Sequence, residues 1–172
     1  INTTSVLGRY SQIYAANEEH KTFLEVGTWN GLGTTKVLYD QMKKRSDHDG
    51  GGYVFYSLEC NTEESQIAGM FYRGENNIQV LNEVLSTPSD PEIEEAFPEI
   101  THDRGLKAWS TIDNTNIHSS KKFLERADLP ETFDVVLLDG GEFTTIFDFH
   151  AIKNRCRCLL LDDTLSLKCR KI

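Results

Sequence analysis

The stretch that decides the fold is Thr22-Phe23-Leu24-Glu25-Val26-Gly27-Thr28-Trp29-Asn30-Gly31-Leu32-Gly33-Thr34. It begins with a short apolar run over residues 22–26, which is typical of a buried parallel strand. The glycines that follow allow a tight turn and let a ligand come close to the main chain. Apolar residues at helical spacing then predict a helix over residues 34–45, which ends in basic residues. The stretch therefore predicts a strand, a turn and a helix, with the turn placed to face a ligand.

The alternation of strand and helix patterns continues on both sides of this unit. Strands are predicted at residues 22–26, 53–58, 78–81, 133–138 and 158–161. Helices are predicted at residues 5–17, 34–45, 61–72, 120–127 and 144–154, and Asp49-Gly50-Gly51-Gly52 predicts a turn. This order is typical of an α/β protein with a doubly wound, mainly parallel sheet and helices on both faces. We expect a single domain over residues 1–172.

Residues 86–119 form the segment whose pattern is least regular, since they combine prolines, acidic residues and scattered aromatics. A part of the segment, around residues 91–97, is predicted to be helical. Long connections in compact domains are often lids or substrate loops, so we expect this insert to shape an acceptor pocket. His102, Trp109 and His118 are its candidates for contact with an acceptor, with packing under the loop the simpler interpretation of Trp109.

Acidic and amide side chains follow nearly every predicted strand. The residues at these strand ends are Glu59, Asn82, Glu83, Asp139, Asp162 and Asp163. In an open parallel sheet, ligands bind beyond the carboxyl ends of the strands. One or two of these residues could cap helices, but a structural role does not need carboxylates gathered at one edge, where they repel one another. The pattern therefore favours a binding site.

The glycine spacing and two acids indicate which cofactor this edge would hold. The turn has the spacing Gly27-x-x-x-Gly31-x-Gly33 and not the Gly-x-Gly-x-x-Gly of dinucleotide-binding proteins. Glu59 can accept both hydroxyl hydrogens of a ribose. Glu25, just before the first glycine, would repel a pyrophosphate but would attract a sulfonium cofactor.

The segment 23–35 resembles motif I of class I S-adenosylmethionine-dependent methyltransferases. More narrowly, the chain resembles the small O-methyltransferases of the catechol and macrocin type over about residues 22–165. The resemblance implies a Rossmann-like fold and transfer of a methyl group to a hydroxyl of a small polyol acceptor, for which we expect a sugar. It also implies a set of cofactor-binding residues, in which the first residues line the methionine part, Glu59 holds the ribose and Asn82 or Glu83 lies near the adenine: Glu25, Gly27, Thr28, Trp29, Gly31, Glu59, Asn82, Glu83 and Asp139.

The resemblance further implies a divalent cation, with Asp139, Asp162 and Asp163 as its ligands. Carboxylates at neighbouring strand ends suit a hard cation such as Mg²⁺, which prefers oxygen ligands. Such a metal would lower the pKa of an acceptor hydroxyl. We expect Asp139 and Glu142 to be the catalytic residues, although Glu142 stands where the catechol type has a lysine and could be a solvated loop acid.

Other departures from the family concern the end of the chain. Lys168 follows the acidic pair and could reach the acceptor, whereas His150 is expected on a helix surface. The full fold has two more strands after the fifth, so we expect that C-terminal hairpin to be missing or altered. Because the first residue is Ile1, we expect the sequence to be a trimmed piece or one domain of a larger protein.

Composition narrows the choice of partners and compartment. The formal net charge of −9 and the pI near 5.0 argue against nucleic acid as the main partner. No stretch has the length and apolarity of a membrane span, and the N-terminus lacks the pattern of a signal peptide. The four cysteines are not spaced as a zinc site, so reduced thiols and a cytoplasmic location are expected.

Three alternatives to the methyltransferase of small acceptors remain. The first is an NAD-binding oxidoreductase with the same fold. The second is a non-catalytic cofactor-binding module of a larger glycan-processing protein. The third is a nucleic-acid methyltransferase, which would be expected to carry an Asn/Asp-Pro-Pro-Tyr/Phe motif where this chain has Asp139-Gly140-Gly141-Glu142.

Overall fold

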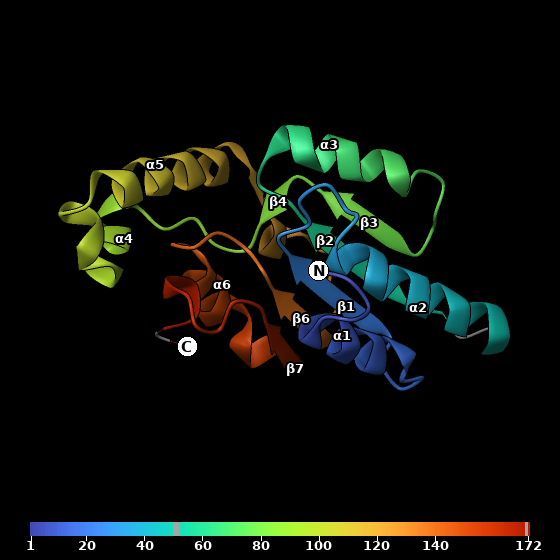
Figure 1. Ribbon diagram of the computed structural model, residues 1–172. Helices are drawn as coiled ribbons and strands as arrows, with labels where there is room; N and C mark the ends of the chain where they lie inside the picture. The colour runs from blue at the N-terminus through green and yellow to red at the C-terminus, as the bar shows by residue number, and fades with distance from the viewer. Residues whose placement is uncertain (50–51, 171) are drawn as a thin grey trace.

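The fold is built on one five-stranded parallel sheet (Figure 1). The computed structural model describes residues 1–49, 52–170 and 172. The strands of the sheet are β1 (Thr22–Val26), β2 (Val54–Leu58), β3 (Ile78–Leu81), β6 (Phe133–Leu138) and β7 (Cys156–Leu161). Their order is β3-β2-β1-β6-β7, and each neighbouring pair is parallel. The predicted α/β, Rossmann-like, doubly wound sheet is confirmed.

Helices precede β1 and connect the strands of the sheet, as the sequence predicts. They are α1 (Val6–Ala16), α2 (Thr34–Asp49), α3 (Thr62–Phe71) and α6 (Thr145–Ile152), the last followed by the 3₁₀ turn η3 (Lys153–Arg155). Asn61 caps α3, since its side chain accepts hydrogen bonds from the N–H groups of Glu63 and Glu64. Helix α2 runs past residue 45, and the turn predicted at residues 49–52 falls in part on residues 50–51, which lie outside the described residues.

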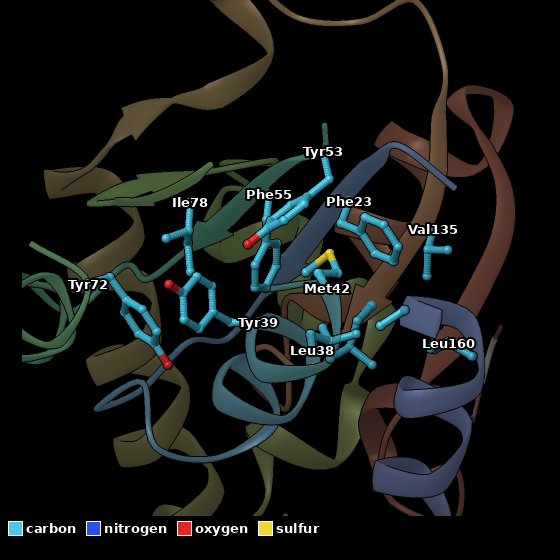
Figure 2. Close-up of a cluster of buried hydrophobic side chains, with 12 residues drawn as sticks. Phe23, Leu38, Tyr39, Met42, Tyr53, Phe55, Tyr72, Ile78, Val135 and Leu160 are labelled. Carbon is cyan, nitrogen blue, oxygen red and sulfur yellow. The ribbon is translucent and has the colours of Figure 1, made fainter. Parts of the chain in front are cut away.

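Alternation along the strands separates two apolar layers, one on each face of the sheet. Phe23, Phe55 and Val135 point to the face covered by α1 and α2, where Leu38 and Met42 meet them, as Figure 2 shows. The residues next to them in the strands point to the opposite face and pack with Phe123, Phe149 and Ile152, and these residues are Leu24, Tyr56 and Val136. Burial of both faces explains why the strands have near-continuous apolar runs.

The insert has more regular structure than its sequence indicates. It contains α4 (Asp90–Ala96), η1 (Pro98–Thr101) and α5 (Arg104–Ser119). Helix α4 agrees with the predicted helix at 91–97, whereas α5 was not predicted. Figure 1 shows α4 and α5 grouped at one end of the molecule. Apolar residues of α4 and η1 pack on Phe143 and Ile146 beside α6, which joins the insert to the main fold.

The helix predicted over residues 120–127 is wrong. Lys121–Lys122 forms the short strand β5, which pairs in parallel with β4 (Glu83–Val84), and Phe123–Glu125 is the 3₁₀ turn η2. The Phe123 ring is fully buried, with its centroid 5.3 Å from that of Tyr56. Strand pairing and burial of this ring outweigh the local helical pattern.

After β7 the chain forms a last 3₁₀ turn, η4 (Leu167–Cys169), which contacts α6. Within the described residues, no helix has the length and apolarity that a membrane crossing requires. The cysteines in this part of the chain form no disulfide.

Candidate functional site

A cavity of about 490 Å³ opens beyond the carboxyl ends of β1, β2 and β6. It lies where the order of the strands reverses, between β1 and β6, which is the place where open α/β sheets bind ligands. Gly27 and Asp139 follow these two strands, and the Asp139 N–H donates to the Val26 carbonyl at 2.8 Å. The opposite wall is formed by residues 83–86 and by α5 of the insert.

The turn after β1 depends on glycine at two positions. Gly27 has φ 97°, and a Cβ at this residue would lie 2.2 Å from the Asp139 carbonyl oxygen. Gly31 has φ 77° and packs against Ala68 of α3. Trp29 also has a positive φ, 49°, and this residue, which lines the cavity, is 64% exposed. Only a residue without a side chain allows the turn to pass this close to the end of β6 at Gly27.

Glu25 lies beneath this turn and does not line the cavity. Its carboxylate is fully buried, and Oε2 accepts hydrogen bonds from Ser57 Oγ at 2.6 Å and Thr35 Oγ1 at 2.7 Å. Thr28 contacts the same Ser57 hydroxyl, at 2.6 Å. Burial raises the pKa of Glu25 to about 7, although both hydroxyl groups oppose the rise. Its other oxygen, Oε1, is buried without a partner.

Glu59 faces the cavity from the end of β2. Its Oε2 accepts the Trp29 N–H at 2.6 Å, and its Oε1 accepts the Asn61 N–H at 2.8 Å. Asn82 lies behind it, where its amide donates to the Glu59 and Cys60 carbonyls. Glu83 lines the cavity and pairs with Arg126 at 3.2 Å, while its Oε2 is buried without a partner. Glu59 and Glu83 thus reach the cavity, whereas Asn82 holds the loop in place.

Every charged side chain that lines the cavity in the described part of the chain is a carboxylate. No lysine, arginine or histidine is among the lining residues there. The acidic residues are Glu59, Glu64, Glu83, Asp113, Asp139 and Asp148. This lining favours a positively charged ligand over a negatively charged one, although Arg126 already pairs with Glu83 and Lys168 with Asp139.

Asp113 and Asp148 belong to this lining, and the sequence analysis missed both. Burial raises the pKa of Asp113, on α5, to about 6, and Glu142 and Glu59 add to the rise. Burial raises the pKa of Asp148, on α6, to about 7, against the hydrogen bond of 2.6 Å that Ser86 Oγ donates to it. Neither residue follows a strand, so the strand-end pattern could not reveal them.

Asp139, Asp162 and Asp163 come together, as the spacing of the strands predicts. Each offers an oxygen within 4.8 Å of the others. The Lys168 ammonium lies among them, 3.0 Å from Asp139 Oδ1 and 3.3 Å from Asp163 Oδ2. A divalent cation that bridged these two carboxylates would need the place that the ammonium takes. The residues as arranged therefore do not fit a metal.

Burial and the neighbouring opposite charge shift the pKa values of Asp139 and Lys168 in opposite directions. Burial raises the pKa of Asp139, Lys168 opposes the rise and Asp162 adds to it, and the resulting value is about 6. Burial lowers the pKa of Lys168, but Asp139 and Asp163 outweigh it and leave the pKa above its usual value. At neutral pH the lysine is therefore charged, and most of Asp139 is ionised.

The other predicted residues lie away from the cavity wall. Glu142 Oε1 accepts the Leu167 N–H at 2.7 Å and the Lys168 N–H at 3.3 Å, so this carboxylate holds η4. Trp109 packs edge-on against Phe143, with centroids 5.8 Å apart. Three exposed histidines, at positions 102, 118 and 150, are absent from the cavity wall.

Comparisons with known proteins find a likeness among solved structures and none among sequences. No protein-family profile and no curated protein sequence matches the chain. A similar solved structure is the O-methyltransferase from Bacillus cereus in complex with SAH, at 15% sequence identity and a TM-score of 0.46. The match covers 91% of this chain and 54% of that chain, so the present chain spans about half of its length. This likeness concerns the fold alone.

Proposed function

We propose that the chain binds S-adenosylmethionine and transfers its methyl group to a hydroxyl of a small polyol acceptor, for which we favour a sugar. The observation that carries the proposal is the purely acidic charged lining of the cavity at the switch point of the sheet. S-adenosylmethionine carries positive charge on its sulfur and its ammonium group, whereas a dinucleotide carries a negatively charged pyrophosphate. Coulomb attraction in a partly buried site favours the first and disfavours the second.

Features of the lining fit such a cofactor. Glu59 lies where a carboxylate can accept hydrogen bonds from ribose hydroxyls, in addition to those from Trp29 and Asn61. Glu83 lines the same cavity, and its Oε2 is buried there without a partner. Glu25 Oε1 is a second unpartnered oxygen beneath the turn, and its burial makes it sensitive to a cation placed above it. Buried acceptors in folded proteins usually have a hydrogen-bond donor or a positive charge as partner, which a bound cofactor would supply here.

A bound S-adenosylmethionine would supply an electrophilic methyl group, and the chain would orient the acceptor oxygen and accept its proton. Asp139 and Asp113 are candidates for this acceptance, because a carboxylate with a pKa of about 6 is largely ionised at neutral pH and still a usable base. Gly140 and Gly141 line the cavity beside them, and Gly141 lets the Asp113 carboxylate come close to the backbone. Most of the rate enhancement would come from this positioning.

The choice of a sugar rests on the polar wall formed by Ser86, Asp113, Thr144 and Asp148, which offers acceptors for several hydroxyl groups. Assistance by Mg²⁺ was expected from the sequence, through Asp139, Asp162 and Asp163. We derive no step through a metal, because Lys168 already lies between two of these carboxylates.

Calorimetric titration with S-adenosylmethionine, S-adenosylhomocysteine and NAD⁺ tests the proposal. We expect one site for each sulfur cofactor and none for NAD⁺. Glu59→Gln should weaken binding about tenfold, as expected for the loss of one charge-assisted interaction. Glu63→Gln is the matched control, because Glu63 lies in the first turn of α3 but outside the cavity lining. Binding of NAD⁺ in place of S-adenosylmethionine would refute the proposal.

A second assay separates an enzyme from a binding module. Methyl transfer from labelled S-adenosylmethionine is measured with sugars and with catechols as acceptors. Transfer to a sugar supports the full proposal, and transfer to a catechol alone contradicts the choice of acceptor. Cofactor binding without transfer to any acceptor would favour the non-catalytic module.

A further inference from the structure

We propose that Lys168 is a built-in cation that replaces a divalent metal at the ends of β6 and β7. The wild-type chain then binds no divalent cation at Asp139, Asp162 and Asp163, and loss of the lysine charge exposes a latent metal site. This inference does not depend on methyl transfer, since it concerns only which cation occupies the cluster.

The position of the ammonium carries the inference. Lys168 Nζ lies 3.0 Å from Asp139 Oδ1 and 3.3 Å from Asp163 Oδ2, so it bridges the acid after β6 and the second acid after β7. The lysine side chain is only 5% exposed. Lysine is rarely buried unless it is paired, and this one is paired twice. Its charge is therefore part of the cluster.

The backbone around Lys168 is arranged to keep the ammonium there. After Asp163, whose φ is 49°, the chain turns back, and the Ser166 N–H donates to the Asp163 carbonyl at 2.8 Å. Glu142 then accepts the N–H groups of Leu167 and Lys168.

The apolar side of the turn and its far end are anchored as well. Leu167 packs on the apolar cluster of α4, η1 and α6. Beyond it, Arg170 pairs with Glu99 of η1 at 2.9 Å. These contacts fix the turn η4, and the fixed turn directs the Lys168 side chain toward Asp139 and Asp163.

A metal and this ammonium exclude each other. Mg²⁺ holds its oxygen ligands at about 2.1 Å, with near-octahedral geometry. An ion bridging the same two oxygens would lie close to Nζ, where two positive charges repel strongly in a partly buried site. Binding would require Lys168 to leave a buried position and the carboxylate oxygens, now spread over as much as 4.8 Å, to draw together.

Lys168 acts on the cavity through Asp139, because Asp139 lines the cavity and Lys168 does not. Lys168 is therefore a positioning residue. It fixes the direction of the Asp139 carboxylate and offsets its charge, which a metal would otherwise do.

The test is a titration of Mn²⁺ followed by its electron paramagnetic resonance signal and by calorimetry, on wild type, Lys168→Met and Lys168→Arg. We expect weak or no binding to wild type and to Lys168→Arg, and at least about tenfold tighter binding of one ion to Lys168→Met, because a like charge is removed. Adding Asp162→Asn to Lys168→Met should abolish the gain. Lys44→Met is the matched control, since Lys44 is exposed on α2 and far from these strands in sequence.

Two results overturn the inference. One is stoichiometric Mn²⁺ binding by wild type that Asp163→Asn removes, because the metal then displaces the lysine. The other is a folded Lys168→Met that binds Mn²⁺ no better than wild type. If Lys168→Met does not fold, the wild-type titration and Asp163→Asn decide alone, since the Asp163 side chain is 62% exposed and tolerates the change. Absence of wild-type binding then supports the inference.

Discussion

Glu25 should make the stability of the protein depend on pH, and the size of the effect follows from its burial. Burial raises the pKa of this carboxyl from 4.5 to about 7. Below pH 4.5 the group is protonated in both the folded and the unfolded chain, so it has no effect. Between about pH 4.5 and 7 the unfolded chain loses the proton first, and the free energy of unfolding falls as the pH rises. Above about pH 7 both states are ionised and the loss is complete.

The magnitude is the shift of about 2.5 pKa units multiplied by about 1.4 kcal/mol per unit, or about 3 to 4 kcal/mol. Glu25→Gln removes this loss, because an amide does not ionise. The glutamine carbonyl oxygen can still accept the hydroxyl groups of Ser57 and Thr35, which now bond to Oε2. The variant should therefore lose about 3 to 4 kcal/mol less than wild type when the pH rises from about 4.5 to 8.

Urea unfolding followed by circular dichroism at several pH values measures this difference. Asp148 has a raised pKa of the same sign, so the variant is compared with wild type and not with a flat profile. Glu18→Gln, at an exposed position, is the control and should leave the profile unchanged. If the profiles of Glu25→Gln and wild type coincide, the carboxyl is not held neutral by burial and the reasoning fails.

Three further predictions concern the turn, the core and the cavity. Gly27→Ala should destabilise the fold by about 3 kcal/mol or more, because its φ is 97° and the added Cβ would lie 2.2 Å from the Asp139 carbonyl oxygen. Thermal unfolding measures this loss of stability, and Gly33→Ala is the control, since a Cβ at Gly33 has no atom within 4 Å. Phe123→Ala should cost about 3–5 kcal/mol and the exposed Lys122→Ala little, in urea unfolding, because the ring is fully buried. Binding of S-adenosylmethionine should strengthen as the pH rises through about 6, because Asp113 and Asp139 then ionise, and Asp113→Asn should reduce this dependence in calorimetry; an unchanged dependence would contradict the role of Asp113.

Much of the fold could be predicted because the strands are short, apolar runs that end at glycines or acids. The run at β1 and its turn at Gly27 have the same bounds in the sequence pattern and in the structure. Helix α5 was missed because its buried positions include the polar residues Ser110 and Asn114 beside Ile117, where a sequence pattern is expected to show apolar residues. The helix predicted at residues 120–127 is wrong because Phe123 and the apolar residue next to it pack against the sheet and do not form the apolar face of a helix.

In the site, too, the contacts between strand ends could be predicted from the sequence, whereas the contacts made by residues on helices and turns could not. Strand ends meet at one edge of a parallel sheet, so the approach of Asp139, Asp162 and Asp163 follows from the strand pattern alone. Asp113 and Asp148 reach the cavity from helices, and nothing in their spacing connects them to a strand end.

Lys168 shows why a pattern of metal ligands is an incomplete argument. The carboxylates are necessary for binding a divalent cation, but whether a cation can bind also depends on the other side chains in the cluster. Glu142, predicted from the sequence to be catalytic, accepts two backbone N–H groups of η4 and so directs Lys168 toward Asp139. The residue that was expected to act on the acceptor thus helps to place the cation that opposes a metal. A prediction of metal binding from strand-end acids should therefore be checked against any lysine that a short turn can bring back to them.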